Sequence, residues 1–185
     1  MKIKLLLVVA AVFVAAGAAG QDLAVKTNVL YWGTATPNLA FEIGTGKKTS
    51  LEIAGGWNPW TYDNDKKMKH YIIQPEFRWW FCERFNRSFI GIHLHGGEFN
   101  VGGMGPIKTI KDHRYEGWFY GAGVSYGHQW ILAKRWGLEG EIGVGYARLE
   151  YDRFRCGKCE PRINRDHYNY FGPTRASLSF VFYIR

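Results

Sequence analysis

The stretch LEGEIGVGYARL, residues 138–149, decides the fold class of this chain. Successive side chains of an extended strand point to opposite faces, so this stretch divides into two rows. One row is apolar and consists of Leu138, Ile142, Val144 and Tyr146, and the other consists of Glu139, Glu141, Gly143, Gly145 and Ala147. A half-buried strand of a soluble protein turns its apolar row toward the core, whereas a strand of a membrane β-barrel turns it toward lipid.

The first twenty residues, MKIKLLLVVAAVFVAAGAAG, have the order of a cleaved secretory signal. Two lysines precede an uncharged apolar run from Leu5 to Val14, and small residues follow up to a cleavage site before Gln21. The alternative is an N-terminal membrane anchor, which a longer apolar run or a lipid-attachment cysteine would favour. We therefore expect residues 1–20 to be a signal peptide and residues 21–185 to form one exported domain.

The composition of the exported part excludes several other classes. It has no run of about 18 apolar residues, so no transmembrane helix is expected. Three cysteines are too few for a disulfide scaffold. Aromatic residues make up 17% of the chain and there are 23 glycines, which is high for a soluble domain of this size. The formal net charge of +8 for the whole chain falls to +6 without Lys2 and Lys4 and is still basic, but nucleic acid is not an expected partner of an exported chain.

Beyond residue 21 the dominant hydrophobic period is two, which indicates an all-β chain. Polar, turn-rich segments separate the apolar alternations, and no stretch of ten or more residues has helical spacing. The pattern predicts eight strands, at residues 23–33, 38–46, 49–60, 69–81, 88–102, 116–133, 136–154 and 170–185.

The two faces of these strands differ in the same way as those of the first stretch. Aromatic residues gather toward the ends of the apolar rows, as Trp118 and Trp130 do around Val124, and such rings favour the two interfaces of a membrane. The opposite faces hold carboxylates, basic groups and histidines among small residues. From these faces the sequence predicts a polar network in the lumen, in which Lys26 stands beside Glu42, Glu52, Glu76, Arg78, His93, His95, Glu139, Glu141 and Arg175.

The connections alternate in length as they do in outer-membrane proteins. Those expected on the inner side are short (46–48, 82–87 and 134–135), and three of those expected outside are longer (62–68, 103–115 and 155–169). An even number of antiparallel strands can close without leaving an edge in lipid. We therefore predict an eight-stranded antiparallel up-and-down transmembrane β-barrel in the outer membrane of a Gram-negative bacterium, too narrow for a diffusion pore.

The cysteines and histidines allow several interpretations. Cys156 and Cys159, in RCGKCEP, are expected to form a small disulfide in the last outer loop, with reduced thiols or a redox-active motif as alternatives, and Cys82 is expected to be a buried or rim thiol. His93 and His95 share one face of a strand and could ligate a metal, but hydrogen bonds to lumen carboxylates explain them equally well. No metal or cofactor is expected.

The outer loops are basic, and this suggests contact with lipopolysaccharide phosphates through Lys108, Lys111, Arg162 and Arg165. An ordinary solvated surface is the alternative. No catalytic residues are expected, because Ser125 and His128 point to opposite faces of their strand and no acid partner can be assigned.

Several stretches also carry a family resemblance. They include KTNVLYWGTATPNLAFEIG, QPEFRWWFCERF, YGAGVSYGHQWILAKRW and LEGEIGVGYARLEYDRFRCGKC, and together they cover most of residues 21–185. In them the chain resembles a family of small uncharacterised outer-membrane barrels of Bacteroides-type bacteria, whose members often lie near fimbrial genes. The resemblance implies a non-catalytic envelope component that assists or anchors fimbriae.

The partners expected from this interpretation are outer-membrane lipid and lipopolysaccharide, the barrel-assembly machinery, and fimbrial or other surface proteins. Two other functions stay open. One is a barrel enzyme that modifies lipid A or lipopolysaccharide. The other is a soluble periplasmic, lipocalin-like barrel that binds a small apolar ligand, which requires the apolar rows to point inward.

Overall fold

A computed structural model describes residues 23–60, 67–102, 113–155 and 162–184. They form eight strands and one short helix. In chain order these are β1 (Leu23–Asn28), α2 (Val29–Trp32), β2 (Asn38–Gly44), β3 (Thr49–Asn58), β4 (Lys67–Trp80), β5 (Arg87–Gly102), β6 (His113–Ala133), β7 (Trp136–Arg155) and β8 (Arg162–Ile184). No helix in the described ranges is long and apolar enough to cross a membrane.

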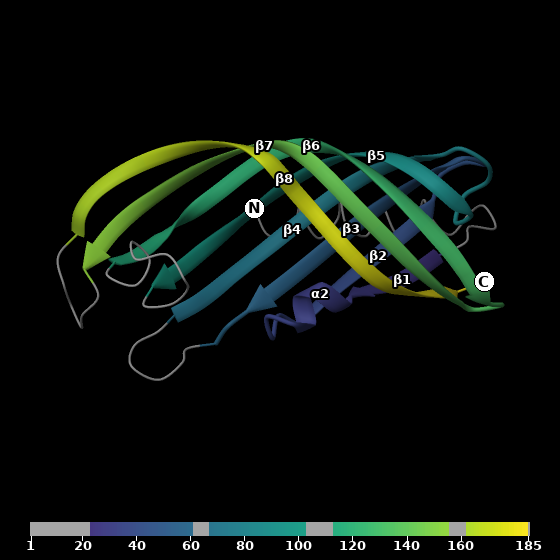
Figure 1. Cartoon of the computed structure of the whole chain (residues 1–185), viewed down its shortest axis with the longest axis horizontal. Coiled ribbons are helices and arrows are strands. Elements are labelled where there is room, and N and C mark those ends of the chain that lie inside the picture. The colour runs from purple at the N-terminus through teal and green to yellow at the C-terminus, as the bar shows by residue number, and fades with distance from the viewer. Residues whose placement is uncertain (1–22, 61–66, 103–112, 156–161, 185) are drawn as a thin grey trace, which may run out of the picture.

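The strands form one closed antiparallel barrel (Figure 1). Each strand pairs with the next in sequence, and β1 closes the ring by pairing with β8, from Leu23 opposite Ile184 to Asn28 opposite Ser179. The predicted eight-stranded, up-and-down, all-β architecture is confirmed. The expected signal peptide, residues 1–20, lies outside the described residues.

The barrel wall is much taller on one side than on the other. We call the end where Leu23 and Ile184 lie the terminal end, and the opposite end, where β4, β6 and β8 begin, the loop end. The strands lengthen around the ring from 6 residues in β1 and 7 in β2 to 21 in β6, 20 in β7 and 23 in β8. Figure 1 shows β6, β7 and β8 reaching furthest at the loop end.

Two predicted strands differ from those in the structure by more than three residues at one end. The first was expected to continue to residue 33, but Val29 and Tyr31 lie in helix α2, which starts where the Asn28 side chain accepts a hydrogen bond from Leu30 N. The last was expected to begin at residue 170, but β8 begins at Arg162. Its first residues, RINRDHYN, are almost entirely polar and so lack an apolar row, yet they complete the pairing of the long β7.

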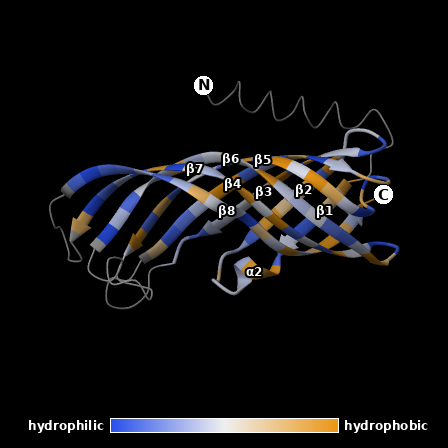
Figure 2. Ribbon diagram, turned by 45° about the horizontal axis from the view of Figure 1, so that its top comes forward, coloured by the Kyte–Doolittle hydropathy of each residue, from blue (hydrophilic) through white to orange (hydrophobic). Residues whose placement is uncertain are grey.

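The barrel exposes its apolar rows on the outside and buries charged side chains inside. Hydrophobic and hydrophilic residues follow one another along its strands (Figure 2). Ile92 and Ile142 are 64% and 62% exposed, whereas Glu42 and Arg78 are completely buried. The other apolar rows are exposed in the same way, including Phe41, Ile53, Phe77, Val124 and Phe180. This arrangement is the reverse of the one that a soluble barrel with an apolar ligand cavity needs.

A small aromatic cluster fills the terminal end of the barrel. It consists of Trp80, Phe85, Phe89 and Tyr183 with Ala24 and Val181, all nearly or fully buried. The rings of Trp80 and Phe89 lie 4.7 Å apart between centroids, and Trp80 Nε1 donates to Ser50 Oγ at 2.8 Å. The Arg78 guanidinium lies 4.3 Å from the Phe89 ring centroid. The aromatic cluster is therefore in direct contact with the charged side chains of the interior.

Candidate functional site

The interior of the barrel is occupied by eight charged side chains contributed by six strands. The five carboxylates are Glu42 on β2, Glu52 on β3, Glu76 on β4, and Glu139 and Glu141 on β7. The three cations are Lys26 on β1, Arg78 on β4 and Arg175 on β8. None of the eight is more than 7% exposed. We call this set the ion-pair network.

Lys26 and Arg78 hold the half of the network nearer the terminal end. Lys26 Nζ lies 2.6 Å from Glu139 and 2.9 Å from Glu52, and it also contacts Glu42. Arg78 Nη1 contacts the same three carboxylates at 2.8–3.1 Å. Strands far apart in the sequence are therefore joined across the lumen by charge-assisted contacts, which are stronger than neutral hydrogen bonds.

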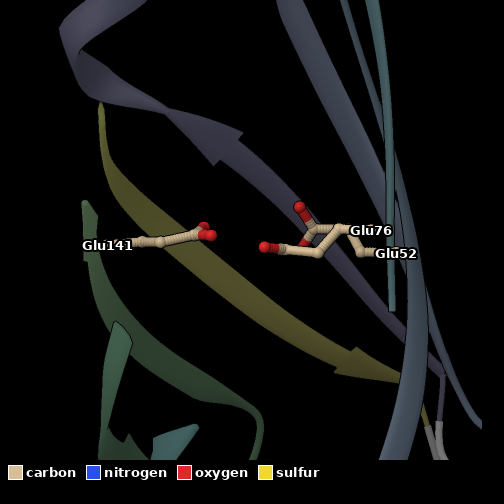
Figure 3. Close-up of side chains that lie close together, drawn as sticks. All are labelled: Glu52, Glu76 and Glu141. Carbon is tan, nitrogen blue, oxygen red and sulfur yellow. The ribbon is translucent and has the colours of Figure 1, made fainter. Parts of the chain in front are cut away.

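Arg175 holds the other half of the network together with Arg78. Arg175 Nε lies 2.9 Å from Glu141, and Nη2 lies 3.4 Å from Glu76 and also contacts Glu52. Figure 3 shows Glu141 pointing across the interior toward Glu52 and Glu76. Oxygens of these three carboxylates lie within 4.8 Å of one another, a spacing that could suit a metal ion. Both arginines contact all three, however, so here the carboxylates are ion-pair partners.

Small side chains let the network fill the lumen. The hydroxyls of Ser50 and Ser125 donate to Glu42 and Glu76, respectively. A methyl group added at Gly143 would lie 3.1 Å from Arg175 Cβ and 2.9 Å from the His93 ring. Because charged and polar groups occupy the cross-section from wall to wall, the network acts as a plug.

The two histidines lie beside the network on its loop-end side. His93 Nε2 hydrogen-bonds Thr174 Oγ1 at 2.9 Å, and His93 Nδ1 lies 4.0 Å from Glu76 Oε1. The His95 ring centroid is 5.6 Å from that of His93. Both rings pack against glycines of β6, where a Cβ would lie 2.5 Å from His95 Nε2 at Gly121 and 2.7 Å from His93 Nε2 at Gly123. The structure therefore brings together all nine residues predicted for the lumen, and Lys26 lies with them.

The predicted loop sites are described only in part. Cys156, Cys159, Lys108 and Lys111 lie outside the described residues, as does the side chain of Arg162, whose backbone begins β8. Arg165 is exposed, with Nη2 3.8 Å from Glu150 Oε2. Cys82 is an exposed free cysteine in the turn after β4, so the expectation of a rim thiol is met and that of a buried thiol is wrong.

One contact between polar side chains was not predicted from the sequence. Ser88 and His128 are paired across β5 and β6, and Ser88 Oγ hydrogen-bonds His128 Nδ1 at 2.8 Å. The hydroxyl of Tyr126, which is exposed among the outer apolar side chains, donates to Ser88 Oγ at 3.0 Å. Ser125 points inward to Glu76, as expected of a residue on the face opposite His128. Only the register between β5 and β6, which the sequence leaves open, identifies Ser88 as the partner.

A groove of about 660 Å³ lies at the loop-end side of β3 to β7 and was also not predicted. Its lining includes the aromatic residues Trp57, Tyr71 and Trp118 and the acidic residues Glu98, Glu116 and Asp152. Trp57 is opposite Tyr71, Tyr71 is opposite Glu98, and Glu98 is opposite Trp118, so these four side chains form one row across four strands. We call it the loop-end groove.

Comparison with known proteins places the chain in a family. Residues 4–184 match the family described as Protein of unknown function (DUF3575), and the chain belongs to that family. No curated protein and no solved structure matches it. The expectation of a domain of unknown function is thereby confirmed.

Proposed function

We propose that this protein is a non-catalytic β-barrel of the bacterial outer membrane, an envelope component that assists or anchors surface fimbriae. The membrane location and the link to fimbriae are separate parts of the proposal. The location is supported by the geometry of the barrel, whereas the link to fimbriae is supported only by the family resemblance of the sequence.

The observation that carries the location is the inverted distribution of side chains. Outward rows such as Phe41, Ile53, Ile92, Val124 and Ile142 would be in contact with water in a soluble protein, where burying one large apolar side chain contributes about 1.5–3 kcal/mol. In a bilayer the same rows contact hydrocarbon, and every backbone group of a closed ladder at that depth is paired. Lipid is therefore the solvent that this surface fits.

The plugged interior argues against a role as a diffusion channel. The ion-pair network joins β1, β2, β3, β4, β7 and β8 across the lumen, and the terminal end is filled by the cluster around Trp80 and Phe89. A closed barrel of this kind offers its partners the outer surface and the loop end.

Heat-modifiable migration tests the location. Outer membranes from cells that express the full chain would be compared, boiled and unboiled, on a denaturing gel. We expect an outer-membrane band that migrates differently until it is boiled, because a closed barrel resists detergent unfolding. Recovery of the protein in the soluble periplasmic fraction, with no shift, would show that the location is wrong.

The link to fimbriae needs its own test. Deletion of the gene in its native host should reduce the length or surface attachment of fimbriae, measured by electron microscopy and shear release, and the intact gene should restore them. Unchanged fimbriae in a strain that lacks the protein would remove this part of the proposal and leave the membrane location standing.

A second candidate function is modification of an envelope lipid, and it is favoured by the Ser88–His128 contact. A serine hydroxyl that donates to an imidazole can act as a nucleophile with a general base, and this pair lies on the lipid-facing side. Among the described residues no carboxylate contacts His128, so the acidic residue that completes a Ser-His-Asp triad is not in place. Mass spectrometry of lipid A and phospholipids should show an altered acyl pattern that disappears in Ser88→Ala if this candidate is right.

A further inference from the structure

The loop-end groove has a composition that membrane anchoring leaves unexplained. Aromatic residues alone at the end of an apolar belt fit a membrane interface. Here carboxylates alternate with them, since Glu98 lies directly between Tyr71 and Trp118 in the row across β4, β5 and β6. Trp57 and Trp118 are 63% and 43% exposed. An anchoring belt does not require these acids.

A second row, parallel to the first, lies one step closer to the loop end. In this row Lys69 is opposite Asn100, Asn100 is opposite Glu116, and Glu116 is opposite Asp152. The groove therefore combines flat aromatic surfaces with a set of planar hydrogen-bonding groups. Asn100 Oδ1 is shielded from solvent and makes no hydrogen bond within the described part of the chain.

We propose that the loop-end groove binds the uncharged pyranose headgroup of a glycolipid in the outer leaflet. This inference rests on the proposed membrane location. One face of a pyranose ring carries only C–H groups and can lie on an aromatic ring, while its hydroxyls hydrogen-bond to carboxylates and amides. The volume of the groove, about 660 Å³, falls within the range of about 300–1,000 Å³ that is usual for small-molecule sites.

The charge of the groove selects against phosphate-rich headgroups. Its lining contains three carboxylates, Glu98, Glu116 and Asp152, and one lysine, Lys69, and Arg114 lies 3.5 Å from Glu116, so the carboxylates outnumber the nearby cations. An anionic ligand would meet an excess of like charge there, and like charges at close range cost free energy. A neutral sugar avoids this cost and uses the carboxylates as hydrogen-bond acceptors.

The neighbourhood of the groove favours a lipid-linked sugar over a free one. The next row toward the terminal end consists of Ile73, Gly96 and Tyr120. Ile73 on β4 is opposite Gly96 on β5, and Gly96 is opposite Tyr120 on β6. Ile73 is 54% exposed and Tyr120 45% exposed. The groove therefore borders directly on the exposed apolar rows of the outer surface, which we call the apolar belt. Tyr120 also stacks on Trp118, with centroids 5.2 Å apart and planes 15° from parallel. A headgroup in the groove could therefore keep its acyl chains against the barrel wall.

Photocrosslinking to a defined glycolipid tests this inference. The full-length protein, purified from outer membranes, would be placed in phosphatidylcholine nanodiscs that contain a photoreactive glucosyl-diacylglycerol. The concentration for half-maximal crosslinking would be compared among the wild type, Glu98→Gln and Trp118→Ala. We expect an increase of about tenfold in each variant, the loss typical of one good polar or aromatic contact.

Trp79→Ala is the matched control, because Trp79 is also an exposed tryptophan, 54% against 43% for Trp118, but lies near the terminal end of β4. It should crosslink like the wild type. All variants must retain the heat-dependent gel shift, and Trp118→Phe replaces Trp118→Ala if the latter does not fold. Equal crosslinking in Glu98→Gln, Trp118→Ala and Trp79→Ala would overturn the inference, as would equal crosslinking by a photoreactive phosphatidylglycerol. Efficient competition by free maltotriose would show that the ligand is a free glycan and that the lipid-linked source is wrong.

The same samples separate this inference from the proposed membrane location. A wild-type barrel that shifts on heating in outer-membrane fractions but crosslinks no glycolipid leaves the location intact and removes the groove as a glycolipid site. A protein recovered without any shift in the soluble fraction removes the location itself.

Discussion

Lys26 and Glu139 are 113 residues apart in the sequence, yet Lys26 Nζ lies 2.6 Å from Glu139 Oε2 inside the barrel. The contact joins β1, the first strand, to β7, the strand next to the closing strand β8. It can form only when the ring is nearly complete. This contact therefore stabilises the closed barrel and no smaller part of it.

Removing one cation from the network should destabilise the barrel strongly. Arg78→Met leaves five carboxylates without the guanidinium that lies between them, and breaking a buried pair on one side costs about 3–5 kcal/mol. Urea titrations in lipid vesicles would measure the change in the free energy of unfolding. The control Arg148→Met removes a half-exposed arginine paired with Glu150 and should cost no more than about 1 kcal/mol. If Arg78→Met lowered the free energy of unfolding no more than Arg148→Met does, the network would not be a stabilising element.

A charged side chain placed on the outer surface should destabilise the barrel more, the closer it lies to the middle of the membrane-spanning part. Ile142 is 62% exposed near the middle of β7, so Ile142→Arg should lower the free energy of unfolding in vesicles by about 2–4 kcal/mol. His167 is exposed much nearer the loop end, and His167→Arg should cost at most about 1 kcal/mol. If both substitutions proved equally mild, the belt would not be facing hydrocarbon.

Glycines beside the interior histidines should not tolerate a methyl group. At Gly123 a Cβ would lie 2.6 Å from Val144 O and 2.7 Å from His93 Nε2, closer than real Cβ contacts, so Gly123→Ala should cost about 1–3 kcal/mol. At Gly55 the nearest atom, Ile72 O, is 3.9 Å away. Gly55→Ala should therefore fold with little change in the temperature of its gel shift. If Gly123→Ala were as stable as Gly55→Ala, the interior would be more loosely packed than the structure shows.

The side chain of Asn28 should help to hold β1 against β8 on the loop-end side of their last backbone pair. It accepts hydrogen bonds from Leu178 N at 3.1 Å and Leu30 N at 3.0 Å, and it donates to Ala176 O at 3.2 Å. Asn28→Ala removes all three and should cost about 1–2 kcal/mol, like the loss of other helix N-caps. Asn28→Asp keeps both acceptor contacts and should recover part of that loss in the same urea titration. An alanine variant as stable as the wild type would contradict this role.

Labelling of Cys82 tests the orientation of the barrel in the proposed outer-membrane location. It is exposed in the turn between β4 and β5, at the terminal end. In a background of Cys156→Ser and Cys159→Ser, a membrane-impermeant maleimide should leave Cys82 unlabelled in intact cells and label it after the outer membrane is opened. Labelling in intact cells would place the terminal end at the cell surface and contradict the expectation that the short connections, including residues 82–87, lie on the inner side.

The sequence predicted the strand number and the facing of the side chains because both follow from the period of two. Glu139, Glu141 and Ile142 are on their expected faces for this reason alone. The start of β8 could not be predicted in the same way, since residues 162–169 have almost no apolar row and pair because β7 offers them an edge. The turn into α2 likewise depends on hydrogen bonds of Asn28 with β8, which only the closed barrel supplies.

The candidate sites show the same division. The members of the ion-pair network could be named from their face, but their pairing depends on which strands meet across the lumen. The Ser88–His128 contact and the loop-end groove depend on register between neighbouring strands, and one residue of slip would move every side chain to the other face. Alternation alone does not determine that register.

The tall wall formed by β6, β7 and β8 has a consequence for the way a partner would be bound. With 23 residues at roughly 3.3 Å each, β8 is far longer than the 9–11 residues, approximately, that a tilted strand needs to cross a bilayer. About half of it would stand clear of the lipid as hydrogen-bonded sheet. A ligand or protein that docks there meets a surface whose conformational entropy was already lost on folding, so little of the binding free energy is spent on ordering it.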